Sequence, residues 1–534
     1  MYTKNEGSNN ETDVYPLTSY QGDIWIEQMI YSDKPLYNIG GYIEVMGKIK
    51  PGIFHKSVDC LLRENDALRT VFFEKDGQPF QSFLPQTEYS GVFYDFSNEA
   101  NPAEYSKTWM DCEMVKPFNI YGDILCKICL IKAEEDLFYI FYKCHHLITD
   151  GWGFSVICER FKKIYTAMSQ DKENVPESIY SYSEFILEEQ KYSNEKNRLF
   201  WKERLKELPE PLLMRRTDGH SDSFTKSSRE SIALERRLYN GIIDFCNSNG
   251  CSIFHFFLGI LAVYFSRIYS RDSIVIGVSI LNRKNAKFKS IVGHFANVIP
   301  LIISVYKGQG FIDLMQKIRD DLKECYRHQR LSCGQILNEI EDSIVKKTDI
   351  IEIMLSYEKH KHDVTFGEFT ANAVALTNYN KKNPLSLFIR EFDEERDVIV
   401  NFDYQIEVFN DAFPIKNVVG NLKNLLLEVL ADCSKDVIEL NYLSWDEKFK
   451  IQYEINDTKA DYPRDKTIHE LFEEQAGKTS GNIAVVYEEK ELSYRELNTK
   501  ANQLAGVLRD KGVKPDTIVA IMSERSLEMI IGLL

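Results

Sequence analysis

The chain has 534 residues and a mass of 62.1 kDa, which is enough for about three structural units. Hydrophobic residues make up 44% of it, which is typical of globular proteins and excludes an intrinsically disordered chain. The formal net charge of −16 at pH 7 disfavours nucleic acid as a partner, because phosphate binding needs a cationic surface. The longest apolar stretch, residues 253–265, is too short to span a bilayer, so we expect no membrane partner and a cytoplasmic location.

The cysteines give no indication of a metal site. The chain has eleven, and its polar, acidic first 14 residues do not resemble a signal peptide, so we expect reduced thiols. Cys126 and Cys129 are spaced like half of a zinc site, but they fall in the apolar run 123–131, which predicts a strand. Side chains three positions apart on a strand face opposite sides, and no second pair of ligands follows. We therefore predict that the chain binds no metal.

Two predicted elements enclose the most informative segment. Residues 137–142 are an unbroken aromatic and aliphatic run, which predicts a buried strand. Residues 152–168 carry apolar side chains near helical spacing, which predicts a helix. Between the two, the sequence from His145 to Gly151 reads HHLITDG. Tight strand-to-helix connections are where α/β proteins usually expose catalytic side chains, so this segment is the candidate active site.

The residue types in this segment indicate proton transfer. Histidine titrates near neutral pH, so one imidazole can take a proton from an amine or alcohol that attacks a carbonyl. We assign this role to His146 and a supporting role to His145. Gly151 has no Cβ, so a substrate could pass close to the backbone there. No G-x-S-x-G elbow or papain-like cysteine signature accompanies the histidines, which favours direct transfer over a covalent enzyme intermediate.

Asp150 has two possible roles. It could orient the imidazole, as the acid of a catalytic triad does. It could instead be a buried structural anion, which would need a cation beside it. Arg283 offers that cation shortly after the apolar strand predicted for residues 273–279. We favour the structural ion pair of Asp150 with Arg283.

The composition of the chain also indicates where its parts divide. Residues 171–176 are polar and end in proline, so we place a boundary between two lobes, residues 1–175 and 176–440, in this segment. After about residue 440 the sequence becomes more charged, and residues 456–463 have the composition of a linker. We therefore predict a linker over residues 441–466, followed by a separate segment, residues 467–534.

The HHLITDG segment resembles the HHxxxDG motif of the condensation domains of nonribosomal peptide synthetases, which belong to the chloramphenicol-acetyltransferase-like acyltransferases. Further motifs resemble those of that family in the same order along about residues 14–440. They are LTSYQGDIW at 17–25, DALRTVF at 66–72, YSEF at 182–185, VGHFAN at 292–297 and HQ at 328–329. After the linker, TIHELF at 467–472 and LSYREL at 492–497 resemble the start of an adenylation domain. The phosphate loop and amino-acid pocket of such a domain would lie beyond residue 534.

Some positions depart from the family pattern. Tyr20 and Asp23 stand where alanine and arginine are usual, Val298 replaces a threonine, EN at 64–65 replaces Arg-His, and RLS at 330–332 replaces D-Y-P. The late R-D-x-S-R-N-P-L motif is not recognisable. Because the catalytic motif is intact, we interpret these departures as subtype differences. NDALR at 65–69 and NRKNAK at 282–287 resemble starter condensation domains, which N-acylate the first amino acid of a lipopeptide.

The resemblance implies an α/β pseudo-dimer of two similar lobes in a V, with a central tunnel entered from opposite ends by donor and acceptor pantetheine arms. His146 would position or deprotonate the acceptor amine for attack on the donor thioester. Asp150 would pair with the arginine at the position of Arg283, and Trp152 and Asn297 are candidates for lining the tunnel. The domain itself would bind no cofactor, because phosphopantetheine would be carried by partner carrier proteins or arrive as part of acyl-CoA.

We therefore expect a starter-type condensation domain, which joins a fatty acyl thioester to the amine of a carrier-bound amino acid. Its expected partners are acyl-CoA or a donor acyl carrier protein, a downstream peptidyl carrier domain and the remainder of the adenylation domain. One alternative is an elongation condensation domain that takes a peptidyl donor from a separate protein. Another is a catalytically silent platform of the same fold that recruits other proteins. A stand-alone CoA-dependent acyltransferase shares the HxxxD chemistry, but the adenylation-like segment argues against it.

Overall fold

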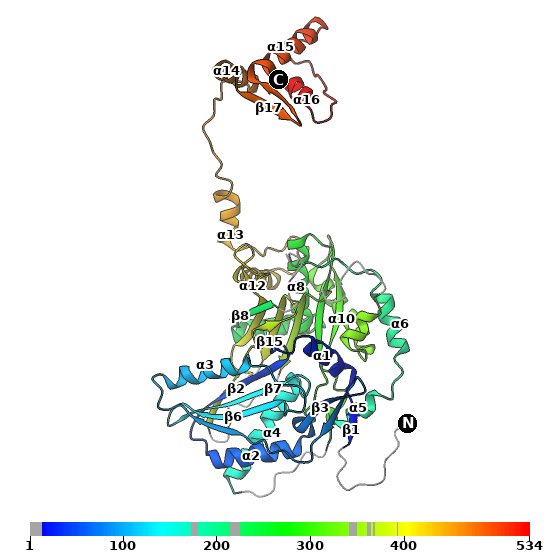
Figure 1. The fold of residues 1–534 in the computed structure, drawn as a ribbon, viewed down its shortest axis with the longest axis vertical. Coiled ribbons are helices and arrows are strands. Elements are labelled where there is room, and N and C mark those ends of the chain that lie inside the picture. Colours follow the sequence, from blue (N-terminus) through cyan, green and yellow to red (C-terminus); the bar gives the residue numbers. More distant parts are fainter. Residues whose placement is uncertain are drawn as a thin grey trace. The chain divides into compact units, whose positions relative to one another are not determined.

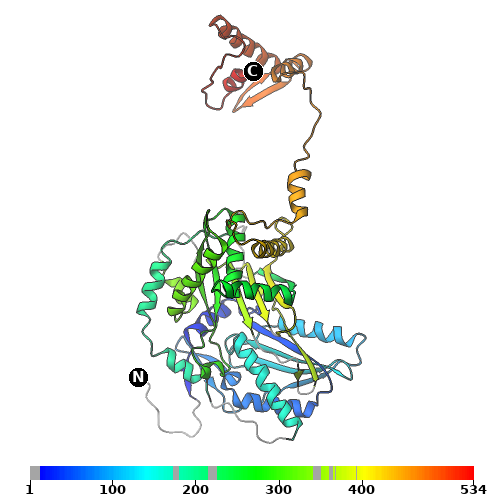
Figure 2. The same cartoon turned by 180° about the vertical axis from the view of Figure 1, so that it is seen from behind.

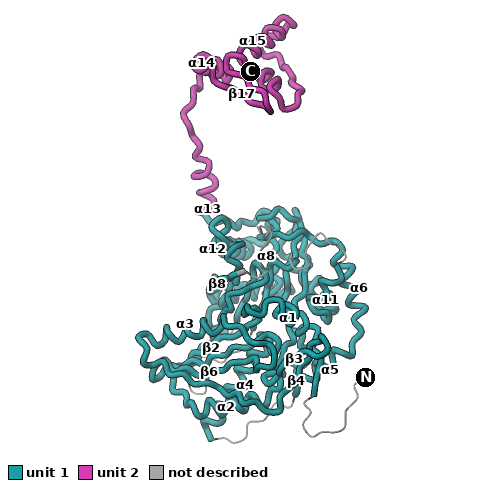
Figure 3. Tube along the Cα trace, viewed as in Figure 1, with its two compact units in different colours: residues 1–445 teal, residues 446–534 magenta. Residues whose placement is uncertain are grey.

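A computed structural model describes most of the chain, in two compact units, residues 1–445 and 446–534 (Figure 3). The described residues are 13–171, 180–213, 225–340, 350–359, 365–366, 369–391 and 394–534. The lobe boundary expected at residues 175 and 176 therefore lies outside the described residues.

The first unit contains two large sheets (Figures 1 and 2). One has six strands in the order β12-β13-β2-β7-β6-β5. Their bounds are β2 (Asn38–Met46), β5 (Val92–Asp95), β6 (Cys126–Lys132), β7 (Leu137–His145), β12 (Thr365–Phe366) and β13 (Phe369–Ala375). The strands β12 and β13 come from the later part of the chain, and β13 pairs antiparallel with β2. The two sheets are therefore not divided at a single point of the sequence.

Helices cover both faces of the six-stranded sheet, α2 (Pro51–Glu64) and α4 (Gly151–Ser169) on one and α3 (Pro102–Met114) on the other (Figure 1). The alternation of side chains along β7 accounts for the two cores. Ile140 joins the core under α2 and α4, whereas Phe141 joins the core under α3.

The predicted elements around the candidate site are confirmed: the strand expected at 137–142 is β7, and the helix expected at 152–168 is α4. Cys126 and Cys129 of β6 fall in the two opposite cores, as their spacing on a strand predicted.

A smaller three-stranded sheet, of order β1-β4-β3, lies beside the first core with helix α1. The bounds are β1 (Val14–Pro16), α1 (Ser19–Ile30), a 3-10 helix (Asp66–Arg69), β3 (Thr70–Lys75) and β4 (Gln78–Phe83). Thr18 and Gln21 form a capping box at the start of α1. The Gln21 side-chain amide also donates a hydrogen bond of 2.8 Å to the carbonyl of Leu147. This contact fixes α1 to the turn that carries the HHLITDG segment.

The second large sheet has seven strands in the order β10-β9-β11-β15-β16-β8-β14. Their bounds are β8 (Thr225–Leu234), β9 (Ser273–Ile280), β10 (Asn297–Ser304), β11 (Ile353–Lys359), β14 (Asn380–Lys381), β15 (Leu385–Glu391) and β16 (Val398–Gln405). The strand predicted at 273–279 is β9. The helices of this part are α5 (Ser183–Glu189), α6 (Glu195–Arg204), α7 (Arg236–Ser248), α8 (Ile253–Tyr269), α9 (Ala286–Lys289), α10 (Phe311–Arg327), α11 (Cys333–Asn338) and α12 (Ile415–Ala431).

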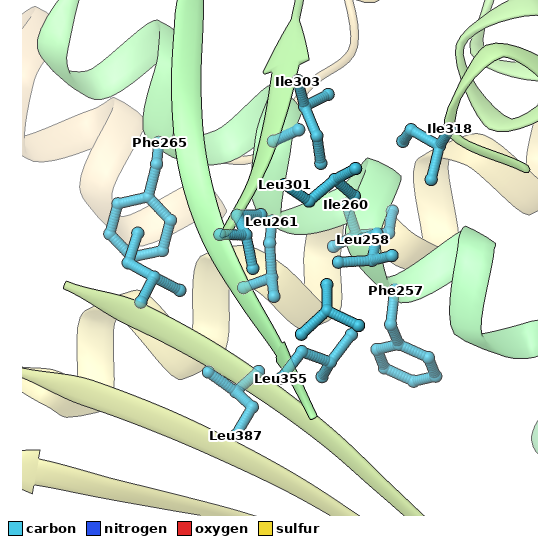
Figure 4. Close-up of a cluster of buried hydrophobic side chains, with 14 of the residues drawn as sticks. Phe257, Leu258, Ile260, Leu261, Phe265, Leu301, Ile303, Ile318, Leu355 and Leu387 are labelled. Carbon is cyan, nitrogen blue, oxygen red and sulfur yellow. The ribbon is translucent and has the colours of Figure 1, made fainter. Parts of the chain in front are cut away.

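Helix α8 is the centre of the second core, because it is apolar on almost every side and is buried along most of its length. Its Phe257 and Leu261 lie with Leu301 of β10, Leu355 of β11 and Leu387 of β15 (Figure 4). Among the described residues, no single helix is long and apolar enough to cross a membrane, although α7 and α8, bent by 98°, pass that test as a pair.

Among its described elements, the second unit contains two short strands and three helices besides the helical segment at its start. After α13 (Trp445–Phe449) and a π-helical turn (Lys450–Glu454), these are α14 (Ile468–Lys478), β17 (Ile483–Tyr487), β18 (Lys490–Ser493), α15 (Tyr494–Asp510) and α16 (Leu527–Leu533). Little of this unit is buried: Ile518 is 95% exposed and Met522 is fully exposed. Large apolar side chains are thus left uncovered in this part of the chain.

Candidate active site

The HHLITDG segment forms the connection between β7 and α4. The strand ends at His145 and the helix begins at Gly151. Asp150 is the N-cap residue of the helix, and its Oδ1 accepts a hydrogen bond of 2.7 Å from the backbone N–H of Gly153. His146 is therefore placed between a buried strand and a capped helix, where both ends of the turn are fixed.

His145 is buried, and both of its ring nitrogens are used by the protein. Nδ1 accepts a hydrogen bond from the backbone N–H of Leu147 at 3.2 Å, and Nε2 lies 3.1 Å from Oε1 of Gln28. Because Nδ1 accepts, the proton is on Nε2 and is donated to Gln28. Burial and the neighbouring His146 lower the pKa of His145 to about 3. The ring is neutral at physiological pH, and its contacts suit the supporting role predicted for it.

His146 is partly exposed, and one of its ring nitrogens is buried. Its backbone N–H donates to the carbonyl of Tyr37 at 2.8 Å, and the Tyr37 ring lies edge-on to the imidazole. Nδ1 is buried without a hydrogen-bond partner among the described residues, while the residue as a whole is partly exposed. Burial lowers the pKa of His146 to about 4, against the opposing effect of the Asp150 charge. The imidazole is therefore neutral at physiological pH, and its Nε2 can accept a proton from a substrate.

The Asp150 carboxylate is turned away from the imidazole. Its Oδ1 lies 2.9 Å from Nη2 of Arg283, and its Oδ2 accepts from the backbone N–H groups of Phe295 and Ala296 at 2.9 and 3.0 Å. Burial opposes the ionisation of Asp150, but Arg283, His294 and the N–H donors outweigh it and hold the pKa below its usual range. Among the described residues, no hydrogen bond joins this carboxylate to His146.

Arg283 also binds the loop of residues 288–296, which follows it in the chain. Its Nη1 donates to the carbonyls of Phe288 and Ile291, both at 2.6 Å, and its Nη2 donates to the carbonyl of Gly293 at 3.0 Å. The guanidinium also lies over the Phe295 ring, 3.9 Å from its centroid. The ion pair thus holds the loop of residues 288–296 against the start of α4. This geometry supports the structural role of Asp150 rather than the orienting one.

Sequence reasoning missed His294, which lies in the loop of residues 288–296 and is packed against His146. The two imidazoles are edge-to-face with ring centroids 5.5 Å apart. His294 is 5% exposed, and burial and the charge of His146 lower its pKa to about 3. Its Nδ1 is buried without a hydrogen-bond partner among the described residues. The signal was present, because His294 lies in the VGHFAN motif, but it occupies the position that the family pattern leaves unspecified.

Trp152 and Asn297 both make hydrogen bonds to loop backbone. The Trp152 indole N–H donates to the carbonyl of Lys289 at 2.8 Å. The Asn297 amide donates to the carbonyls of Gln329 and Leu331 and accepts from the backbone N–H of Cys333. These contacts hold loops beside the site, and the lining of a tunnel by the two residues stays a prediction.

A group of charged side chains lies on one face of the seven-stranded sheet and was also missed. Asp403 of β16 is paired with Arg229 of β8 and Lys381 of β14, and Glu358 of β11 is paired with Arg390 of β15. The sequence signal is a charged residue inside an otherwise apolar strand, as in LFIRE and NFDYQ. Only the fold shows that these strands are neighbours and that Glu358 faces Gly151.

A small apolar cavity of about 20 Å³ lies elsewhere, on the helix-covered face of the same sheet. It is lined mainly by Leu234 of β8, Leu387 of β15, Phe257 and Leu261 of α8 and Leu426 of α12. Leu387 and Arg390 are three positions apart on β15, so their side chains point to opposite faces of the sheet. The sheet therefore separates this cavity from the charged face beside Gly151.

Most of the chain matches a known family. Residues 11–452 match the family model of the condensation domain. The chain belongs to the condensation-domain family. Residues 472–534 match the family of AMP-binding enzymes, which agrees with the predicted start of an adenylation domain. Condensation domains form amide bonds, and the α/β fold is that of the chloramphenicol-acetyltransferase-like class, as predicted.

The similar curated proteins are peptide synthetases. Surfactin synthase subunit 1 of Bacillus subtilis (strain 168) is 26% identical over 98% of this chain, and bacitracin synthase 3 of Bacillus licheniformis is 27% identical over 98%. Gramicidin S synthase 2 of Aneurinibacillus migulanus is 26% identical over 98%. The chain spans 15%, 8% and 12% of the length of these three relatives.

Solved structures support the fold. A mutant of the starter condensation domain of rhizomide synthetase, in complex with C8-CoA, matches with a TM-score of 0.73 at 20% identity, over 80% of this chain and 98% of that one. The first condensation domain of the calcium-dependent antibiotic synthetase matches with a TM-score of 0.72 at 18% identity, over 82% of this chain and all of the other. At this identity the likeness concerns the fold alone.

Proposed function

We propose that the chain joins an acyl thioester to the amine of a carrier-bound amino acid, with His146 as its catalytic residue. The observation that carries the proposal is the partly exposed imidazole of His146, whose Nδ1 is buried and which lies on a fixed turn close to Gly151. Gly151 is solvent-exposed, so an extended pantetheine arm can pass close to the backbone there. Family membership supplies the class of reaction, and the turn supplies a group that handles its proton.

The proposed step is an addition followed by an elimination. The acceptor amine attacks the thioester carbonyl, a C–N bond forms and the C–S bond breaks. The proton lost by the nitrogen passes through Nε2 of His146 to the departing thiolate, so that an amide and a free thiol remain. A neutral imidazole is required at the start, and the lowered pKa of His146 provides it. Phosphopantetheine on a carrier, or CoA, presents the donor, and no cofactor resident in this domain is involved.

We propose further that the donor is a fatty acyl thioester, as in starter condensation domains. The starter-like phrases NDALR and NRKNAK support this choice. So does the likeness in fold to a starter domain whose structure contains C8-CoA. An elongation domain with a peptidyl donor is the second candidate. The catalytically silent platform is disfavoured, because the candidate site keeps a neutral and partly exposed imidazole.

The proposed partners follow from the same scheme. A donor acyl carrier protein or acyl-CoA would deliver the acyl group, and a downstream peptidyl carrier domain would deliver the acceptor. The rest of an adenylation domain would cover the exposed apolar residues of the second unit, among them Ile518 and Met522. We propose a cytoplasmic location and no nucleic-acid partner, in keeping with the net charge of −16.

The first test measures amide formation by mass spectrometry. Acyl-CoAs and acyl carriers of graded chain length are offered as donors, and an aminoacyl carrier as the acceptor. We expect an N-acyl product from the unaltered chain, and none from His146→Ala at an unchanged melting temperature. His469→Ala, at an exposed histidine of the second unit, is the control. Normal product from folded His146→Ala would reject the assigned role, and product from peptidyl donors alone would favour the elongation domain.

A further inference from the structure

Glu358 presents one unoccupied carboxylate oxygen on the charged face of the seven-stranded sheet. Its Oε2 accepts a hydrogen bond of 2.8 Å from Nε of Arg390 on the neighbouring strand β15. Its Oε1 makes no hydrogen bond to any described residue, and the side chain is 21% exposed. The Arg390 contact fixes the plane of the carboxylate and leaves Oε1 free to accept from a ligand.

The free oxygen faces the candidate site. A Cβ built on Gly151 would meet Oε1 of Glu358 at 3.9 Å, with no other heavy atom within 4 Å. Gly151 is the first residue of α4 and is exposed to solvent. Oε1 therefore lies beside the solvent-exposed start of α4, next to the HHLITDG turn, and its charge acts on His146.

The other buried carboxylates of this sheet are already occupied. Asp403 is bound by Arg229 and Lys381. Glu391 is bound by Arg236 and Lys359, and it also accepts a hydrogen bond from Tyr357. Of these three carboxylates, Glu358 is the one that keeps a free oxygen.

We propose that Glu358 is a positioning residue that binds the cationic amine of the acceptor substrate. This inference rests on the proposed function and adds the group that recognises the nucleophile. An aminoacyl acceptor carries an ammonium group near neutral pH, because an α-amino group has a pKa of about 8. The ammonium releases one proton to the solvent before it reacts, and the nitrogen becomes positive again as it attacks the carbonyl. A fixed carboxylate at hydrogen-bond range complements the charge at both stages and accepts no proton itself.

The test compares two acceptors that differ in one group. One carries an α-amine and the other an α-hydroxyl on the same side chain and the same pantetheine thioester, with one acyl-CoA donor for both. We expect Glu358→Gln to lower kcat/KM for the amine about tenfold, mostly through KM, because a charge-assisted hydrogen bond is lost. The hydroxyl acceptor should lose less than about twofold, because it carries no charge to be matched. Glu358→Asp, which keeps the charge, should restore part of the loss.

A binding measurement separates recognition from chemistry. An unreactive acceptor analogue, with an amide in place of the thioester, is titrated beside its des-amino counterpart. We expect the unaltered chain to prefer the amine and Glu358→Gln to lose that preference, while the exposed-site control Glu407→Gln keeps it. Equal losses for the amine and hydroxyl acceptors, or an unchanged preference in the binding experiment, would overturn the proposal. If the unaltered chain forms no amide with any donor, the proposed function fails instead, and the binding preference still tests Glu358.

Discussion

The carboxylate of Asp150 is bound by the guanidinium of Arg283 at 2.9 Å, and both side chains are buried. Asp150 is only four residues from His146 in the sequence, so a triad-like contact was an open alternative. The structure instead uses the carboxylate to cap α4 and to hold the loop that carries His294. The second large sheet is thereby linked to the HHLITDG turn through the residues that follow β9. The aspartate of the motif stabilises the position of the turn, while the proposed proton chemistry is assigned to His146.

We predict that Asp150→Ala acts mainly through stability. The substitution leaves the Arg283 guanidinium buried without its charged partner, at a cost of roughly 3–5 kcal/mol. The free energy of unfolding, measured by urea denaturation, should fall by that amount. Arg283→Met should fall similarly, and the double variant should cost less than the sum of the two single changes. A fully stable but slow Asp150→Ala chain would show that the carboxylate orients the imidazole.

The two glycines at the start of α4 should respond differently to the same substitution. A Cβ on Gly151 meets open space apart from Glu358, so Gly151→Ala should fold at least as stably as the unaltered chain. A Cβ on Gly153 would lie too close to Oγ1 of Thr149 and would also crowd the carbonyl of Gly293. Gly153→Ala should therefore lower the melting temperature. Equal melting temperatures for the two variants would contradict this packing.

The same pair of glycines shows how far the sequence could predict the site. The pattern HHLITDG predicted a turn between a strand and a helix, because hydrophobic periodicity and the polar break are local signals. It drew attention to Gly151 but gave no reason to single out Gly153. The constraint on Gly153 comes partly from the carbonyl of Gly293, which reaches α4 only after the loop is clamped.

Long-range pairing explains the other differences. Although His294 lies in the VGHFAN motif, nothing in the sequence placed it or Glu358 next to His146, because strand order and loop packing bring them there. Long-range pairing is also the reason why the sequence did not predict that β13 joins the six-stranded sheet. Its residues predict a strand at best, while its partner β2 lies more than 300 positions earlier in the chain.

The three histidines of the site predict an acid-sensitive fold. The pKa of His145 and of His294 is lowered to about 3, and that of His146 to about 4, from an ordinary value of about 6.5. The unfolded chain therefore binds more protons than the folded one below pH 6.5. The contribution of the three neutral histidines to the free energy of unfolding is complete above about pH 6.5. It is lost as the pH falls toward the pKa values that they have in the folded chain. The lowered pKa of Asp150 acts in the same direction, but only below about pH 4.

Substitution of one histidine isolates this effect from other titrating groups. His294→Leu keeps an apolar side chain in the loop and removes one group that must stay neutral beside His146, Asp150 and Arg283. Between pH 6.5 and pH 5, each buried neutral histidine costs about 2 kcal/mol of stability. We therefore expect the free energy of unfolding of His294→Leu to fall about 2 kcal/mol less than that of the unaltered chain over this interval. His469→Leu, at an exposed histidine, should leave the pH dependence unchanged. Parallel curves for His294→Leu and the unaltered chain would show that His294 already binds its proton in the folded protein.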